Sequence, residues 1–397
     1  MLREMNIPRF SIVTFALGFF ASPLSAETAI LDRPAVVIHR QGDSECHTFR
    51  IPALATTTKG TLLACYDMRY ESSRDLQGHM DIGLSRSTDG GETWEAPRPV
   101  MDMGEWGELP PEFNGCSDPN VLVDRVTGEI FVSALWSHKK PPGTHQWRGD
   151  GSEPGLEIGK TAQFMVVRST DDGVTWSEPE NWTEKIKNPE WYLFAPAPGN
   201  GITTSDGMLV IPTQGRDKNG DPFSNITSSA DHGKTWTVSP AATLNTTECA
   251  VAELSDGALM LNIRDNSNRK DKSDTNGRAV AVTTDQGQTW SRHVTDHKAL
   301  IEPVCMASLI SHKTQTGKHL LFFSNPKSKT HRKNMTVRMS EDDGKTWPYE
   351  ILLDEKGGAY SSLTMVDDQT LGILYESSLA DMVFQTVEIS GFKSSRH

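Results

Sequence analysis

Five aspartates stand out among the titratable residues because they recur in one eight-residue phrase, S/T-x-D-x-G-x-T-W. A carboxylate can act as a general acid or base, but the neighbours of these five favour a structural role. Asp side chains cap nearby backbone N–H groups, and the glycine two residues later allows the positive φ of a hairpin corner. We therefore predict turn caps, not catalytic groups, at Asp89, Asp171, Asp231, Asp285 and Asp342.

The cysteines and the net charge restrict other kinds of chemistry. No C-x-x-C pair is present, so neither a disulfide framework nor a zinc site is favoured, and no metal or other cofactor is expected. We expect small buried hydrophobic residues, with one incidental bridge left open, at Cys46, Cys65, Cys116, Cys249 and Cys305. A net charge of −13 disfavours a nucleic-acid or anionic-membrane binder, so an anionic ligand requires a local cationic pocket.

The same repeats predict the elements that position a site. Their tryptophans recur at spacings of 82, 60, 54 and 57 residues, and short β-like runs precede the phrase. One hairpin in about 60 residues suits a four-stranded blade, and residues 27–397 divide into six such units. We predict an all-β fold, a six-bladed β-propeller in one domain, with ligands bound over its central axis.

The sixth unit lacks the phrase and must be completed from both ends of the chain. We predict its strands at 361–366, 370–375 and 382–389, closed by an early strand at 35–39, because pairing the ends removes an exposed edge. The longest interval between repeats predicts an insertion at 138–159, rich in Pro, Gly and charge, that forms a loop over one face.

The N-terminal segment has the pattern of a signal peptide. Arg3 and Arg9 precede an apolar stretch at 12–20, and a small-residue segment ends at Ala26. We predict a signal peptide over residues 1–26, with a retained anchor as the alternative. The apolar stretch is shorter than the roughly 20 residues that cross a bilayer. The mature chain is expected to be exported to the periplasm or the outside, as a monomer without a membrane span.

The repeats together with Phe49-Arg50-Ile51-Pro52 resemble the exo-α-sialidase (neuraminidase) family of bacterial type, whose members place an F/Y-R-I-P segment before Asp-box repeats. The resemblance covers residues 46 to about 380. Repeats alone say little about function because non-enzymatic propellers share them, whereas the arginine set is more specific. The resemblance implies a propeller glycosidase whose partners are sialylated glycoconjugates.

Family members bind the substrate carboxylate with three arginines, whose guanidinium groups offer paired donors. Arg50 matches the first by its motif, Arg264 in LNIRDN is similar to the second, and Arg332 in HRKN is similar to the third. Glu376 in LYES resembles the carboxylate that orients the first arginine.

The third arginine has a rival in Arg338. This residue lies just before a repeat, where Arg86 and Arg168 also lie, and a recurring position favours a structural role. We therefore assign the third arginine to Arg332.

The leaving glycosidic oxygen needs a proton donor, and the family-like segment 67–70 is followed by Asp75. We assign Asp75 as the general acid and base, because its rival Asp81 begins a strand. Arg69 is implied to contact substrate beside it. Asp118 in CSDPN is implied to bind the sugar's 4-hydroxyl or acetamide N–H, although Asp-Pro is also an ordinary turn.

The nucleophile must approach a carbon that already bears a carboxylate, so a neutral phenol with a nearby base is favoured over a second anion. Sialidases are already known to use a tyrosine for this purpose. Tyr360 in GAYSSL and Glu248 in TECAV are similar to the family's segments, with Cys249 as a small departure.

The expected function is removal of terminal α-linked sialic acids from glycoproteins, glycolipids and oligosaccharides, with retention of configuration. Three alternatives stay open: a trans-sialidase, an intramolecular transferase that yields an anhydro product, and a non-catalytic propeller that binds sialoglycans. Acceptor-dependent transfer would identify the first, and binding without release of sugar would identify the last.

Overall fold

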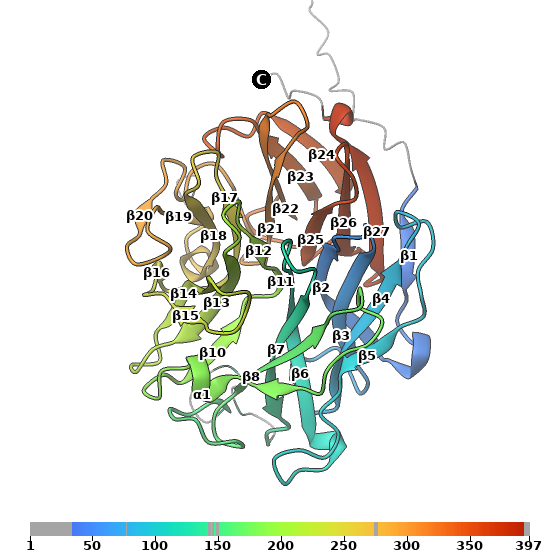
Figure 1. Ribbon diagram of the computed structural model, residues 1–397, viewed down its shortest axis with the longest axis vertical. Coiled ribbons are helices and arrows are strands. Elements are labelled where there is room, and N and C mark those ends of the chain that lie inside the picture. The colour runs from blue at the N-terminus through green and yellow to red at the C-terminus, as the bar shows by residue number, and fades with distance from the viewer. Residues whose placement is uncertain are drawn as a thin grey trace, which may run out of the picture.

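The computed structural model describes residues 34–392, except 77, 142, 143, 145, 146, 148–150 and 274–276. The signal peptide predicted at 1–26 lies outside the described residues. The all-β prediction is confirmed, because strands dominate and helices are short (Figure 1). The helical elements include α1 (Thr183–Ile186) and the 3-10 turns η1 (Asp43–Glu45), η2 (Pro111–Phe113), η4 (Asn266–Arg269) and η5 (Ile389–Gly391).

The strands form five hydrogen-bonded sheets that follow one another around a centre in chain order, a propeller-like arrangement (Figure 1). Three of these sheets are four-stranded and antiparallel. The first contains β17 (Thr246–Glu253), β18 (Leu259–Asp265), β19 (Ala279–Thr283) and β20 (Ser291–Arg292). The second contains β21 (Ser308–Lys313), β22 (His319–Pro326), β23 (Met335–Ser340) and β24 (Tyr349–Asp354). The third contains β1 (Val36–His39), β27 (Met382–Glu388), β26 (Thr370–Glu376) and β25 (Ser361–Met365).

The other two sheets are larger. The six-stranded sheet contains β10 (Leu193–Pro196), β12 (Ile202–Thr203), β13 (Leu209–Arg216), β14 (Pro222–Ser229), β15 (Thr237–Val238) and β16 (Thr243–Leu244). The nine-stranded sheet contains β2 (Thr48–Thr56), β3 (Leu62–Arg69), β4 (Met80–Ser87), β5 (Arg98–Met101), β6 (Asn114–Val123), β7 (Ile130–His138), β8 (Gln163–Ser169), β9 (Glu180–Asn181) and β11 (Gly199–Asn200).

The number of sheets therefore differs from the six predicted blades. In the nine-stranded sheet, β2 to β5 and β6 to β9 are two antiparallel sets, joined through one parallel pair, Met80 and Gly115. A glycine is required there, because a Cβ on Gly115 would lie 2.4 Å from the carbonyl oxygen of Gly78. This close approach lets two predicted blades share one hydrogen-bonded sheet, which no repeat spacing reveals.

The two ends of the chain pair as predicted. β1 runs antiparallel to β27, and the strand order is β1-β27-β26-β25. His39 at the end of β1 reaches the neighbouring sheet, where its Nε2 lies 2.7 Å from the Tyr66 hydroxyl and 3.1 Å from Ser85 Oγ. Its ring also stacks on Phe49, with centroids 4.5 Å apart. The N-terminal strand thus joins the sheet of β25, β26 and β27 to the nine-stranded sheet.

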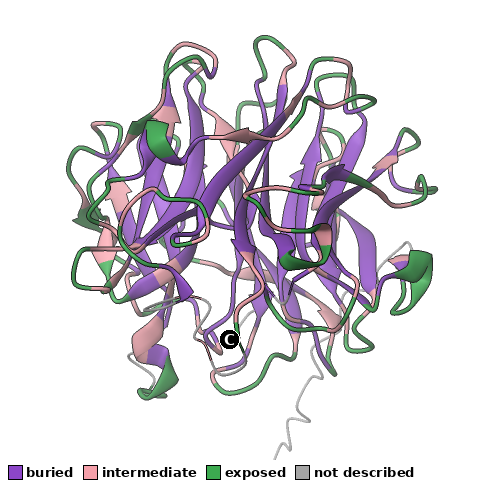
Figure 2. Ribbon diagram, turned by 90° about the horizontal axis from the view of Figure 1, so that it is seen from below, coloured by how far each residue is buried: buried purple, intermediate pink, exposed green. Residues whose placement is uncertain are grey.

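The five repeats form the predicted turns, and exposed loops lie at the edges of the buried strands (Figure 2). In the second copy, Asp171 accepts hydrogen bonds from the hydroxyl and amide of Thr175 and from Ser169 Oγ. These bonds lower its pKa to about 2. Gly173 has φ +78°, and Asp172 before it also has positive φ. The repeated aspartates are therefore turn caps, and none lines the cavity described below.

The remaining predictions on the chain's organisation fall partly on described residues. All five cysteines are buried and free of disulfides. In the insertion predicted at 138–159, the described residues after His138 contain no strand, and the others lie outside the described part. Within the described residues, helices long and apolar enough to span a membrane are absent.

Buried His39 generates a prediction for acid stability. Burial lowers its pKa from 6.5 to about 4. As the pH falls, His39 therefore binds a proton at a higher pH in the unfolded chain than in the folded chain. Stability contributed by neutral His39 is complete above pH 6.5 and is lost as the pH falls toward 4, about 2 kcal/mol between pH 7 and pH 5. Urea unfolding at the two pH values should show a smaller loss for His39→Gln than for wild type. His47 is exposed, so His47→Gln should lose as much stability as wild type. An equal loss of stability in the His39 and His47 variants would contradict the role of buried His39.

Candidate active site

Residues from the inner strands and from the loops between strands line one cavity of about 280 Å³. Strand β2 contacts β25 and β6, and β17 contacts β13 and β21, so these strands form a ring around the centre. Seven of the nine predicted site residues line the cavity: Arg50, Asp75, Asp118, Glu248, Arg264, Arg332 and Tyr360. The other two, Arg69 and Glu376, are buried and contact residues of this group.

A bulge in β2 presents Arg50 to the cavity. The pairing with β3 is interrupted between Arg50 and Ala53. Pro52 lies in this interval and has no N–H to donate to the ladder, and Ile51 before it has φ +58°. The backbone therefore leaves regular strand geometry at the position of a cavity-lining side chain.

Strand β6 repeats this arrangement around Pro119. Its pairing with β7 is interrupted between Ser117 and Asn120, and Asp118 has φ +61°. Strand β17 has a comparable interruption on either side of Glu248. Three inner strands thus carry irregularities at residues that line the same cavity, a placement typical of functional sites.

Glu376 holds Arg50 from behind the cavity. Arg50 donates from Nε to Oε1 at 2.9 Å and from Nη2 to Oε2 at 3.1 Å. The Ile51 amide donates to Oε1 at 2.8 Å. Burial alone would raise the pKa of Glu376, but the Arg50 guanidinium and these hydrogen bonds lower it on balance. Glu376 is therefore ionised, and it fixes the guanidinium plane while 22% of the Arg50 side chain stays exposed.

Tyr360 is the centre of the cavity's polar network. Its hydroxyl donates to Glu248 Oε1 through a short hydrogen bond. Arg264 Nη1 donates to the same hydroxyl oxygen at 2.8 Å and to Glu248 Oε2 at 2.5 Å. Burial and the Glu248 carboxylate raise the pKa of Tyr360 well above its usual value. The phenol is thus neutral, with a hydrogen-bond acceptor for its proton already in contact.

The other two predicted arginines also lie against this phenol. The Cζ atoms of Arg50 and Arg332 are 5.8 Å and 5.4 Å from the centroid of the Tyr360 ring. Arg338, the rival for the third arginine, is buried beside Glu350, with 3.6 Å between Nε and Oε2, and does not line the cavity. The structure therefore brings Arg50, Arg264 and Arg332 together around Tyr360.

Asp75 lines the cavity with a half-exposed side chain. Its Oδ1 is 2.8 Å from Nη1 of the fully buried Arg69, while 47% of its own side chain is exposed. The rival Asp81 is buried, accepts a 2.7 Å hydrogen bond from the Tyr70 hydroxyl, and does not line the cavity. Burial raises the pKa of Asp81 to about 7. Asp75 is thus the one of these two acids that a ligand in the cavity can reach.

Asp118 enters the cavity as a buried carboxyl group. Burial, with a further contribution from nearby Asp67, raises its pKa well above the usual value. Its backbone amide donates to Asp67 Oδ1 at 3.1 Å. The neutral form of Asp118 is favoured, which allows this side chain to donate a hydrogen bond to a ligand.

Several cavity residues were not predicted from the sequence. Trp147 lies in the predicted insertion, and Arg216 Nε donates a hydrogen bond to its carbonyl oxygen. The insertion signal indicated a loop over one face but did not single out Trp147. The remaining lining residues outside the predicted set are Ile51, Leu193, Gln214, Gly215, Thr247 and Arg269.

The sequence is similar to a known protein family. The family model described as a BNR repeat-like domain matches residues 60–374. A curated sialidase from Bacteroides fragilis (strain YCH46) is 49% identical over 370 residues, which cover 92% of this chain and 66% of the relative. The chain belongs to the sialidase family of glycoside hydrolases.

Further members of the sialidase family support this placement. The sialidase of Micromonospora viridifaciens is 35% identical over 83% of this chain and 50% of its own length. The chain thus spans about two thirds of the first relative and half of the second. Among solved structures, Hadza microbial sialidase Hz136 has a TM-score of 0.86 and 46% identity, covering 91% of this chain and 70% of the other.

The Arg50 and Glu376 pair generates a stability prediction for this sialidase-family chain. Glu376→Ala leaves the Arg50 guanidinium and the Ile51 amide without their acceptor, which should lower the free energy of unfolding by about 3 kcal/mol. Glu71→Ala is the control, because the side chains of Glu71 and its partner Lys139 are 43% and 40% exposed. Its effect should stay within about 0.5 kcal/mol. Urea unfolding measures both, and equal small changes would show that the buried pair does not stabilise the fold.

Proposed function

We propose that this sialidase-family chain is an exo-α-sialidase that removes terminal α-linked sialic acids from glycoconjugates with retention. The observation that carries the proposal is the neutral Tyr360 phenol, hydrogen-bonded to Glu248 and Arg264 in a cavity that Arg50 and Arg332 also line. A sialic acid places a carboxylate directly on its anomeric carbon. An anion site beside a neutral nucleophile matches that substrate.

Substrate binding begins with the carboxylate. Arg50, Arg264 and Arg332 offer guanidinium donors around one phenol, and paired donors of this kind suit a carboxylate. Glu376 fixes the first of them through two hydrogen bonds. The bound carboxylate places the anomeric carbon C2 next to the Tyr360 oxygen.

In the first step, the Tyr360 oxygen bonds to C2 while the bond from C2 to the leaving oxygen breaks. Glu248, which accepts the phenol hydrogen bond, takes the phenol proton. Asp75 donates a proton to the leaving oxygen, so the aglycone departs as a neutral alcohol. A neutral phenol avoids the repulsion that a carboxylate nucleophile would meet beside the substrate carboxylate.

In the second step, water attacks C2 and the bond from C2 to the Tyr360 oxygen breaks. Asp75 accepts the water proton, and Tyr360 recovers its proton from Glu248. Each displacement inverts C2, so the two together retain its configuration. NMR analysis of products during sialyllactose cleavage tests this course. Free sialic acid released first as the α-anomer supports it, whereas transfer to an acceptor or an anhydro product would favour a transferase.

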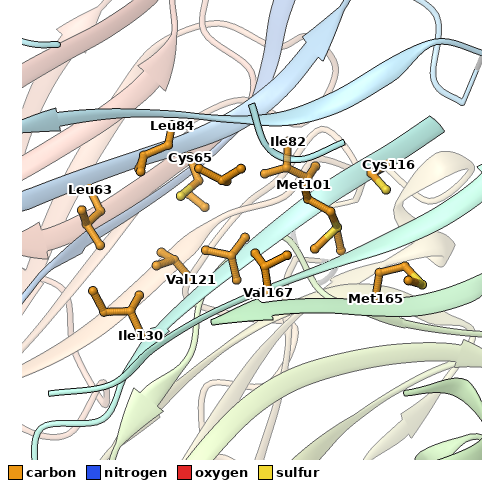
Figure 3. Packing of buried hydrophobic residues seen from close by; sticks show 14 of the residues in the cluster. Leu63, Cys65, Ile82, Leu84, Met101, Cys116, Val121, Ile130, Met165 and Val167 are labelled. Atoms are coloured by element: carbon orange, nitrogen blue, oxygen red, sulfur yellow. The ribbon is translucent and has the colours of Figure 1, made fainter. Parts of the chain in front are cut away.

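We further propose six blades, in which β2 to β5 form one blade and β6 to β9 the next. Side chains of these two sets pack face to face, as Leu63, Cys65, Val121 and Val167 do in Figure 3, which suits stacked blades better than strands side by side in one flat sheet. The predicted leader 1–26 supports export, with residues 27–397 as one catalytic domain. Sialylated glycans outside the cytoplasm would then be the substrates of a monomer.

Tyr360→Phe tests the nucleophile. Loss of the hydroxyl should reduce kcat for an activated sialoside by at least about a thousandfold. Loss of the two hydrogen bonds of the hydroxyl, to Glu248 and from Arg264, should cost about 2 kcal/mol of stability. Tyr375→Phe is a matched control, because Tyr375 is a buried tyrosine that does not line the cavity. Near wild-type turnover by Tyr360→Phe would remove this residue from the mechanism.

Arg50→Lys tests the carboxylate site. Lysine keeps the charge but loses the planar pair of donors, so KM should rise more than about tenfold while the protein stays folded. Arg338→Lys, which changes an arginine outside the cavity, should leave KM unchanged. Steady-state kinetics on a sialoside measure both. The carboxylate assignment fails if Arg50→Lys binds substrate as well as wild type.

A further inference from the structure

Asp67 is a fully buried carboxylate next to the cavity that the proposed mechanism does not use. It lies in β3, has no exposed surface, and does not line the cavity. Burial raises its pKa, whereas the Arg69 guanidinium opposes that change. Three N–H donors and the Ser117 hydroxyl bond to its two oxygens, and this hydrogen-bonding pattern favours the ionised form.

On one side, Asp67 holds Arg69. Its Oδ2 accepts hydrogen bonds from Arg69 Nη2 at 2.7 Å and Nε at 3.1 Å. The opposite nitrogen, Nη1, contacts Asp75 Oδ1 at 2.8 Å and donates to the Ser73 carbonyl at 2.7 Å. One edge of the guanidinium is therefore fixed in the sheet, and the other edge holds the loop that carries Asp75.

On the other side, Asp67 holds the irregular part of β6. Ser117 Oγ donates to Asp67 Oδ2 at 2.8 Å, and the Asp118 amide donates to Oδ1 at 3.1 Å. Ser117 Oγ also lies 3.3 Å from Asp118 Oδ1. These bonds fix the positive-φ backbone from which the Asp118 side chain reaches the cavity. One buried carboxylate thus supports two cavity residues from different segments, Asp75 in the loop after β3 and Asp118 in β6.

We propose that Asp67 is a positioning residue that sets both the placement of Asp75, through Arg69, and the placement of Asp118. This inference rests on the proposed sialidase function, which assigns Asp75 as the general acid and base in the cavity that Asp118 also lines. Asp67 itself touches neither the substrate nor the reacting atoms.

The protonation of Asp118 depends on the charges around it. Asp67 and Arg69 face it from β3, Asp75 from the following loop, and Glu248 from β17. After burial, the negative charge of Asp67 is the largest factor that raises its pKa. Without that charge, Asp118 should ionise at a lower pH. An ionised Asp118 would repel the substrate carboxylate and raise KM.

Asp67→Asn in the full chain tests both effects on a soluble sialoside. We expect kcat to fall roughly 10- to 100-fold, because Arg69 loses the partner that fixes it against Asp75. We also expect KM to begin rising at a lower pH than in wild type. Asp124→Asn is the matched control, since Asp124 is a fully buried aspartate that caps a turn and does not line the cavity. Its kcat and KM profile should follow wild type.

The outcomes separate this inference from the proposed function. Inactive wild type would contradict the proposed function, whereas active wild type with Asp67→Asn kinetics equal to those of Asp124→Asn would overturn the inference. If Asp67→Asn does not fold, Asp67→Glu provides the test. The glutamate keeps the negative charge, but its longer side chain moves the carboxylate away from its present position. Asp67→Glu should lower kcat without moving the pH at which KM rises, and an unchanged kcat would overturn the positioning role.

Discussion

The hydrogen bond from the Tyr360 phenol to Glu248 is the interaction on which the architecture of the cavity depends. A phenol can remain neutral at this position because burial raises its pKa, and its proton faces a carboxylate that Arg264 holds in place. Arginines buried around it would carry a large desolvation cost if they stood alone. Buried carboxylates offset this cost by forming ion pairs with the guanidinium groups. Glu376 pairs with Arg50, and Asp67 pairs with Arg69. Each pair fixes a guanidinium plane as well as its charge.

The strands meet this requirement by departing from regular geometry where they approach the centre. In β2 and β6, a proline interrupts the ladder and the preceding residue adopts positive φ. A regular strand would point alternate side chains to opposite faces, and the bulges alter that alternation for Arg50 and Asp118. A positive φ at these residues raises the free energy of the backbone. The hydrogen bonds from the Ile51 amide to Glu376 and from the Asp118 amide to Asp67 stabilise this conformation.

Turns and strands that depend on local residue patterns could be predicted from the sequence. Contacts that depend on the close approach of distant segments could not. The turn phrase predicted the caps at Asp171 and its equivalents, and the end pairing of β1 with β27 followed from the need to cover an edge. The contact of Met80 with Gly115, which joins two sets of strands into one sheet, has no sequence period and was not predicted. Asp67 lies in the family-like segment that drew attention to Arg69 and Asp75. Its role could not be predicted from the sequence, because it depends on contacts with Ser117 and Asp118 of β6.

The cavity lining is cationic, although the whole chain is anionic. The whole chain carries −13, yet the cavity lining contains five arginines and three carboxyl groups. One of those carboxyl groups, Asp118, is favoured in its neutral form, which makes the lining more cationic still. The proposed substrate brings one carboxylate into this excess of positive charge. The neutral forms of Tyr360 and Asp118 complement the charge of the arginines, because an additional anion beside the bound carboxylate would oppose the attraction that the arginines supply.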